Sequence, residues 1–205
     1  MPLRARLAVL LAATFAIATA FVLIVLEGDE EPRAQARFEG SIRPPGIPPS
    51  DFRMTDQDGK VATLSEYRGR PVVVTFLYTT CEDTCPLTAQ QIRGALDELG
   101  GGDDVPVLIF SVDPPRDTPE RARRFLAEQR VTGRMRFLLG PERELRRQWK
   151  AYGIQRQSED LEHSAWVVLL DRQGRQRIGF PADRVTPDAL ANDLRVLEAE
   201  APPSA

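Results

Sequence analysis

The sequence is poor in thiol and imidazole side chains, with two cysteines and one histidine among 205 residues. A site that needs a thiol or an imidazole must therefore draw on Cys81, Cys85 and His163. The chain also lacks an excess of basic residues, since 27 Lys and Arg stand against 30 Asp and Glu. This balance gives no indication of nucleic-acid binding. No internal repeat is evident, and the length suits one domain with an additional segment at one end.

That additional segment is an uncharged apolar run over residues 7–26. Its length is about that of a helix that crosses roughly 30 Å of hydrocarbon, so we expect a single transmembrane anchor. Arg4 and Arg6 precede the run and acidic residues follow it, which places residues 1–6 in the cytoplasm by the positive-inside rule. The domain that follows is then on the periplasmic side of a bacterial inner membrane.

A cleaved signal peptide is the alternative interpretation of this segment. Residues 18–20 read Ala-Thr-Ala, which matches a small-x-small cleavage site. The apolar run continues beyond that point to Leu26, as a stop-transfer segment does, and this favours the anchor. Both interpretations export the domain to an oxidising compartment.

The chain beyond the apolar run divides by composition. Residues 27–50 are charged and rich in proline, which is typical of an extended tether. We expect the folded domain over residues 51–200, followed by a short tail at 201–205.

Within the domain, apolar runs alternate with amphipathic stretches, and turn or cap residues separate them. The expected strands are residues 52–54, 61–64, 72–78, 105–112, 137–139, 165–170 and 176–180. The expected helices are residues 86–99, 117–129, 142–152 and 187–199. Strands that alternate with helices and close on an antiparallel hairpin predict an α/β three-layer sandwich with a mixed central sheet.

Cys81 and Cys85 lie at the junction between the strand of residues 72–78 and the helix that follows. Pro86 is expected at the first helical position, which leaves Cys85 near the N-cap. A helix N-terminus carries partial positive charge, so it stabilises thiolates and lowers the pKa of cysteine. Because thiolates bind metal ions, the junction is a candidate metal site.

His163 is far from both cysteines in the sequence, and spacing alone does not bring it to them. If the fold does so, two sulfurs and one imidazole suit Cu(I), or Cu(II) with an added weak ligand. Zinc also accepts these ligands but commonly takes a fourth.

Three motifs resemble the Sco/SenC family of copper proteins. They are the stretch from Cys81 to Pro86 (CEDTCP), residues 111–120 (SVDPPRDTPE) and His163-Ser164, and the resemblance extends over about residues 52–197. It implies a thioredoxin-like fold, an N-terminal anchor, and copper ligation, as Cu(I) or Cu(II), by Cys81, Cys85 and His163. One departure is Glu162, where the family commonly has aspartate before the histidine; it bears on the tuning of the site and keeps the charge. Asp113 is a weaker candidate for a polar role beside the metal.

The function implied by the resemblance is a copper metallochaperone that serves the binuclear copper site of cytochrome c oxidase. Its partners are then the copper-bearing oxidase subunit, a copper donor protein and a thiol reductant that resets the cysteine pair. Such a protein needs no covalent catalysis, so we expect a carrier rather than an enzyme.

Two other interpretations of the cysteines stay open. The pair forms a structural disulfide in one, although so short a loop gains little chain entropy. In the other, the chain is a membrane-anchored thiol-disulfide oxidoreductase that reduces cysteines of the oxidase subunit or of another exported protein. Thioredoxin-type reductases mostly have two residues between the cysteines, whereas three are present here. A peroxidase is disfavoured because no Pro-x-x-x-Thr/Ser-x-x-Cys pattern leads into either thiol.

Overall fold

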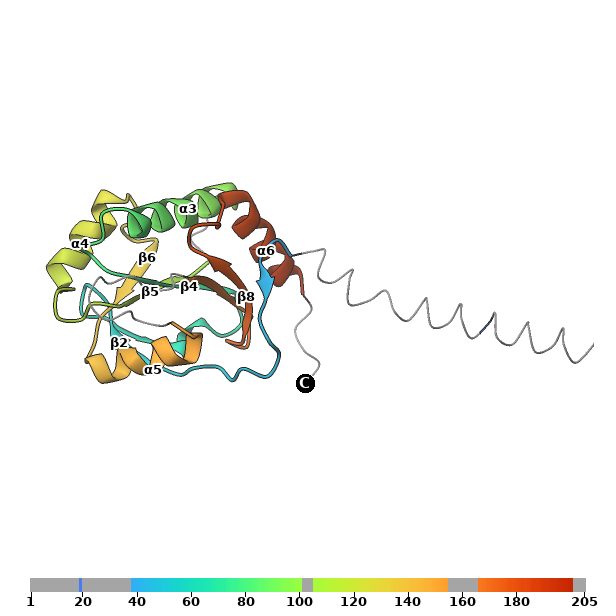
Figure 1. Ribbon diagram of the computed structural model, residues 1–205, viewed down its shortest axis with the longest axis horizontal. Helices are drawn as coiled ribbons and strands as arrows, with labels where there is room; N and C mark the ends of the chain where they lie inside the picture. The colour runs from blue at the N-terminus through green and yellow to red at the C-terminus, as the bar shows by residue number, and fades with distance from the viewer. Residues whose placement is uncertain (1–18, 20–37, 101–104, 155–165, 201–205) are drawn as a thin grey trace, which may run out of the picture. The chain divides into compact units, whose positions relative to one another are not determined.

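A six-stranded mixed sheet forms the centre of the fold (Figure 1). The computed structural model describes residue 19 and residues 38–100, 105–154 and 166–200. In spatial order the strands are β1 (Ser41–Ile42), β8 (Gln176–Pro181), β7 (Trp166–Leu170), β4 (Val72–Leu77), β5 (Val107–Ser111) and β6 (Met135–Leu138). β4, β5 and β6 are parallel to one another, and β7 joins β4 in antiparallel register. The predicted α/β fold with a mixed central sheet is confirmed.

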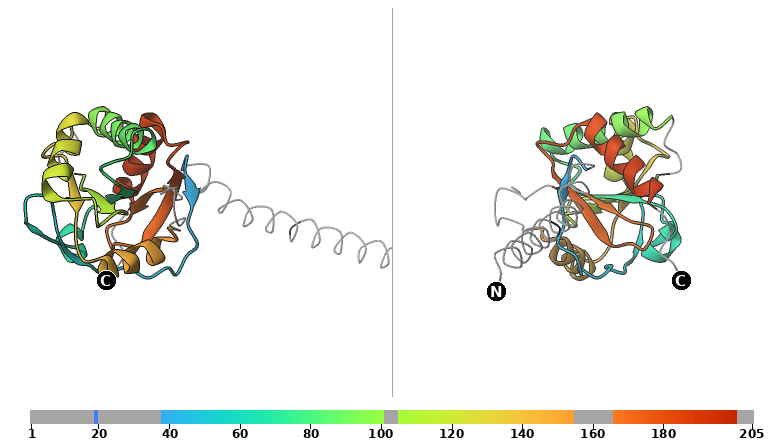
Figure 2. Two further views of the ribbon diagram at one scale, coloured as in Figure 1. Left: turned by 60° about the vertical axis from the view of Figure 1, so that its left-hand side comes forward. Right: turned by 90° about the vertical axis from the view of Figure 1, so that its right-hand side faces the viewer.

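The two faces of the sheet are covered by different elements, which gives three layers (Figures 1 and 2). One face carries the helices α3 (Thr84–Glu98), α4 (Pro119–Glu128) and α6 (Pro187–Ala199). The other carries the helix α5 (Glu142–Tyr152), the hairpin of β2 (Arg53–Thr55) with β3 (Val61–Thr63), and the 3-10 turn η1 (Leu64–Tyr67).

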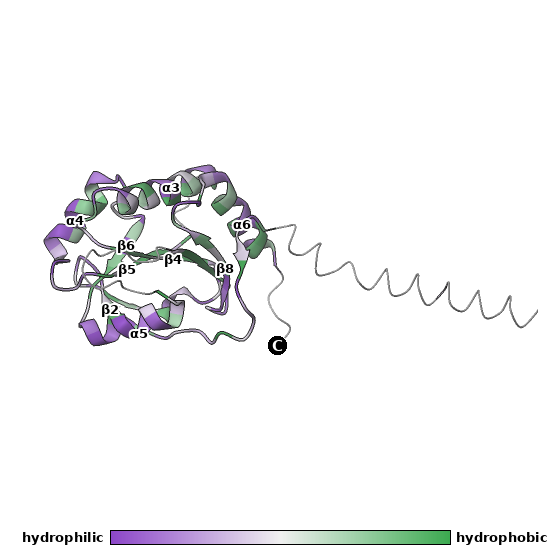
Figure 3. Cartoon of the chain, in the orientation of Figure 1, coloured by the Kyte–Doolittle hydropathy of each residue, from purple (hydrophilic) through white to green (hydrophobic). Residues whose placement is uncertain are grey.

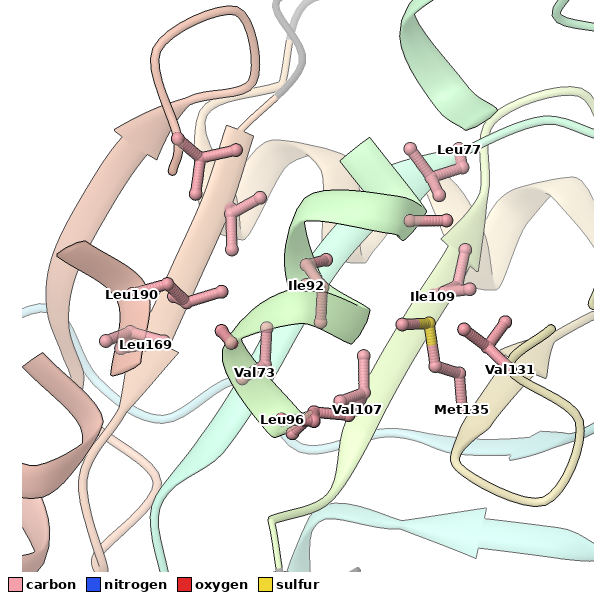
Figure 4. Close-up of a cluster of buried hydrophobic side chains, with 14 of the residues drawn as sticks. Val73, Leu77, Ile92, Leu96, Val107, Ile109, Val131, Met135, Leu169 and Leu190 are labelled. Atoms are coloured by element: carbon pink, nitrogen blue, oxygen red, sulfur yellow. The ribbon is translucent and has the colours of Figure 1, made fainter. Parts of the chain in front are cut away.

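The central strand β4 is buried along its whole length because both faces are covered. Successive side chains of a strand point to opposite faces, so Val73 and Leu77 pack beneath α3 and its neighbours (Figure 4). Val72, Val74 and Phe76 pack toward α5 instead. The central strands β4 and β5 are largely apolar, whereas α5 presents mostly polar residues (Figure 3). This double burial explains why the sequence of β4 is a continuous apolar run rather than an alternating one.

The predicted helices and strands within the described residues are present, and α5 and α6 have the predicted bounds. One local prediction is wrong: α3 begins at Thr84, so Pro86 is the third helical residue rather than the first. Proline is tolerated there because the first four N–H groups of a helix have no partner within it. The turn η1 was not predicted from the sequence.

The predicted anchor, residues 7–26, lies outside the described residues except for Thr19, and so does the tail at 201–205. Among the residues that are described, no helix combines the length and the apolar character that crossing a membrane requires.

Strand β1 lies within residues 27–50, which sequence analysis treats as tether, and it pairs with β8. Both oxygens of the buried Asp193 carboxylate on α6 hold this segment, since they accept the backbone N–H groups of Glu39 and Gly40 at 2.8 and 2.9 Å. The segment around β1 is thus attached to the domain by a two-residue strand pairing and two side-chain hydrogen bonds, which a proline-rich composition does not prevent.

Gly40 packs too closely on β8 to accept a side chain. A Cβ atom added there meets Ile178 and lies 2.7 Å from the ring of Phe180. We expect Gly40→Ala to lower the free energy of unfolding by about 1–3 kcal/mol, the usual cost of overpacking. Urea unfolding of a fragment that starts before Phe38 measures this. Gly140→Ala is the control, because its Cβ atom meets only Met54 Cγ at 3.7 Å, an ordinary contact. Equal stability of the two variants would contradict the packing argument.

Candidate metal centre

Both cysteines lie at the edge of the sheet where the parallel strands β4 and β5 end. Leu77, the last residue of β4, is opposite Ser111, the last residue of β5. Residues 78–83, which we call the thiol loop, lead from β4 into α3 and contain Cys81. Cys85 is the second residue of α3 and is buried, whereas Cys81 is half-buried. The carboxyl end of a central strand and the start of a helix therefore bring the two sulfurs together, as the sequence predicts.

The sulfur of Cys81 accepts a hydrogen bond from the backbone N–H of Cys85 at 3.2 Å. Asp83, at the N-cap of α3, provides no side-chain cap of its own. The Cys81 sulfur thus takes the role that a serine or aspartate oxygen usually has at a helix start. The positive end of the helix dipole favours the anionic form of this sulfur.

The pKa values of the two cysteines are shifted in opposite directions, down for Cys81 and up for Cys85. The hydrogen bond from the Cys85 thiol, assisted by the N–H groups of Cys85 and Asp83 and by the Tyr78 hydroxyl, lowers the pKa of Cys81 to about 5. The same bond and burial raise the pKa of Cys85. Burial and the hydrogen bond to Cys81 also raise the pKa of Tyr78. The pair is therefore one accessible thiolate beside one buried thiol.

A buried aspartate connects the thiol loop to the end of β5. Oδ1 of Asp117 accepts the backbone N–H of Thr79 at 2.8 Å and its hydroxyl at 2.7 Å. Oδ2 accepts the Ser111 hydroxyl at 2.5 Å. Burial raises the pKa of Asp117. Asp117 thereby connects the thiol loop, which follows β4, to the loop that follows β5.

The sequence predicts a polar role beside the metal for Asp113, and it does not point to Tyr78 or Asp117. The Asp113 carboxylate pairs with Arg116 within its own loop. The pattern Asp117-Thr118-Pro119 indicates a helix start, and Thr118 does cap α4 by accepting the N–H of Arg121. Nothing in that pattern shows that the aspartate reaches across to another loop.

His163 falls in residues 155–165, outside the described residues. The chain resumes at Trp166, the first residue of β7, whose carbonyl accepts the Thr75 hydroxyl at 3.1 Å. Because β7 is antiparallel to β4, with Val167 opposite Thr75, β7 begins at the sheet edge where β4 ends. Trp166 thus lies at the edge of the sheet where the cysteines are.

Within the part of the chain that the structure describes, no three His, Cys, Asp or Glu side chains are grouped closely enough to hold a metal ion. Neither cysteine is in a disulfide, so the pair supplies two soft sulfur donors. Such donors fit Cu(I) better than they fit hard cations such as Mg²⁺ or Ca²⁺.

The protonation of the pair predicts how Cys81 reacts with an alkylating reagent. A lowered pKa keeps the sulfur ionised above it, so alkylation by iodoacetamide slows only as the pH falls through about 5. An ordinary cysteine slows near pH 8.5, as only the thiolate reacts. Cys85→Ala removes the largest cause of the shift and is expected to raise the midpoint. Mass spectrometry of the labelled peptide gives the pH profile, and a wild-type midpoint above 8 would contradict the assignment.

The chain is also similar in sequence to known proteins. A family model described as SCO1/SenC matches residues 44–198. A SCO2-like protein of Rickettsia prowazekii is 25% identical over 191 residues, which cover 87% of this chain and 90% of that protein.

Two solved structures show the same fold. The structure of Bradyrhizobium japonicum ScoI with copper bound is 29% identical, has a TM-score of 0.60, and covers 73% of this chain and 98% of its own. BsSco, in which a disulfide switch was identified, is 24% identical with a TM-score of 0.63 and covers 74% and 94%. BsSco is described as a member of the Sco family of cytochrome c oxidase assembly proteins. With its family match over most of the domain and a fold shared with Sco proteins, the chain belongs to the SCO1/SenC family.

Proposed function

We propose that this protein is a copper metallochaperone, which holds copper through Cys81, Cys85 and His163 and transfers it to the binuclear copper site of cytochrome c oxidase. Copper is the cargo in this proposal rather than a resident cofactor. Residues 7–26 anchor the protein in the bacterial inner membrane, with the domain on the periplasmic side. A copper donor protein loads it, and a thiol reductant keeps the cysteines reduced.

The observation that carries the proposal is the pair of sulfurs at the start of α3. Cys81 is already a thiolate, hydrogen-bonded to the N–H and the thiol of Cys85. Binding of a soft cation to both sulfurs displaces the Cys85 proton, as metal binding to a thiol requires. The half-buried position of Cys81 leaves its sulfur accessible to an incoming ion or to a partner's ligands.

His163 completes the ligand set in this proposal. The position of Trp166 beside the end of β4 supports it, since only two residues separate His163 from Trp166 along the chain. An imidazole with two thiolates gives a three-ligand site suited to Cu(I). The copper-bound Bradyrhizobium relative supports the same choice of metal.

A thiol-disulfide oxidoreductase is the second candidate, and the asymmetry of the pair favours it. An accessible thiolate of lowered pKa beside a buried thiol is the arrangement of an attacking and a resolving cysteine. In that mechanism Cys81 attacks a partner disulfide, and Cys85 then releases the partner's thiol as the Cys81–Cys85 disulfide forms. This chemistry uses no histidine.

Copper binding by the reduced domain tests the proposal. We expect about one Cu(I) per chain after removal of excess metal, with X-ray absorption that shows two sulfur donors and one nitrogen donor. His163→Ala is expected to weaken Cu(I) binding by at least about tenfold in competition with a chelator, and to remove the nitrogen donor. Ser164→Ala is the matched control, because it alters the neighbouring residue and keeps the imidazole.

The chain contains no other histidine, so a nitrogen donor of imidazole type that survives His163→Ala cannot come from the protein. Wild-type protein that retains no copper, or that binds it equally well without His163, would refute the proposal and favour the oxidoreductase.

A further inference from the structure

The Asp117 carboxylate is buried where an unpaired charge would be costly. Only 6% of the residue is exposed, and its partners are the N–H and hydroxyl of Thr79 and the hydroxyl of Ser111, none of which is charged. A buried carboxylate needs such hydrogen bonds to offset its loss of hydration. An arrangement with three short bonds to two separate chain segments therefore fixes those segments relative to each other.

The segment that Asp117 holds is the beginning of the thiol loop. Thr79 lies two residues before Cys81, and the N–H of Cys81 turns back to the carbonyl of Tyr78 at 3.4 Å. At the other end of the loop, the Cys81 sulfur accepts the N–H of Cys85 in α3. The loop is thus fixed at both ends, by Asp117 on the β4 side and by the start of α3 on the other.

Ser111, the second partner of Asp117, is itself held in place at the end of β5. Its carbonyl accepts the indole N–H of the buried Trp149 on α5 at 3.0 Å. The next residue, Val112, donates its N–H to the carbonyl of Leu77 at the end of β4, at 3.1 Å. Asp117 therefore fastens Thr79 to a part of the sheet that is held from both sides. The Asp117 side chain therefore fixes the start of the thiol loop relative to the end of β5.

We propose that Asp117 is the positioning residue of the thiol pair, holding Thr79 so that the Cys81 and Cys85 sulfurs remain side by side before they bind a metal or form a disulfide. The copper part of this inference rests on the proposed function, and the disulfide part does not. Preorganisation lowers the entropy that either event must spend on ordering the loop. Loss of the Asp117 contacts therefore weakens both events in the same direction.

Substitution of Asp117 separates geometry from charge. Asp117→Ala removes all three hydrogen bonds. Asp117→Asn has nearly the same shape, and its amide oxygen still accepts from Thr79 while its NH₂ group can donate to the Ser111 hydroxyl. Asp193→Ala is the matched control, since it also removes a buried carboxylate that accepts backbone N–H groups, those of Glu39 and Gly40, and it does not contact the thiol loop.

Two measurements on full-length protein in detergent, well below its unfolding temperature, test the inference. The first is the equilibrium of the Cys81–Cys85 disulfide with glutathione, and the second is the Cu(I) affinity from chelator competition. For Asp117→Ala we expect both equilibrium constants to fall about tenfold, which raises the reduction potential of the disulfide by about 30 mV. Asp117→Asn and Asp193→Ala are expected to stay within about threefold of wild type, although each lowers thermal stability.

Wild-type values of both constants in Asp117→Ala would overturn the inference, and so would an equally large loss in Asp117→Asn, which would assign the effect to charge. Should Asp117→Ala fail to fold, Thr79→Val removes the hydroxyl bond alone and is expected to lower both constants by a smaller factor; no change there would also overturn it. If the wild type binds no copper but the disulfide equilibrium still falls tenfold in Asp117→Ala, the proposed function fails and the positioning role stands.

Discussion

The hydrogen bond from the Cys85 N–H to the Cys81 sulfur is the interaction on which the site depends. It uses an N–H group that every helix start leaves unsatisfied, and it places a sulfur where an oxygen usually caps the helix. One contact therefore ends the thiol loop, starts α3, stabilises a thiolate and keeps the second sulfur within reach. A site made this way needs few residues, which fits a chain with two cysteines and one histidine.

The rest of the fold supplies rigid support for that contact. β4 is buried on both faces, and its parallel pairing with β5 ends both strands at one edge. Asp117 then ties the loop after β4 to the end of β5. A sheet covered on both faces is a rigid scaffold, so the loops that leave its carboxyl edge start from fixed positions. The accessible sulfur belongs to the loop and the protected one to the helix.

Much of this arrangement is predictable from the sequence because strong local signals carry it. The apolar run of β4, the cysteines after it, and the proline and glycine boundaries of α5 and α6 give the element order and the mixed sheet. Contacts between segments that are distant along the chain cannot be predicted in this way. Asp117 looks like part of a helix start, although its carboxylate reaches Thr79, 38 residues away. Strand β1 is only two residues long, and its attachment depends on Asp193, 153 residues after Gly40. Local patterns contain no information about such partners.

Copper delivery rather than disulfide reduction is the central claim, and assembly of cytochrome c oxidase in cells tests it most directly. In cells that lack the chromosomal gene, the wild type, His163→Ala and Cys81→Ser would each be expressed at matched levels, and the copper content and activity of the oxidase measured. The account predicts that His163→Ala fails as completely as Cys81→Ser, because copper binding needs all three ligands. Normal oxidase with His163→Ala, together with its loss in Cys81→Ser, would contradict copper delivery and identify a thiol-disulfide oxidoreductase.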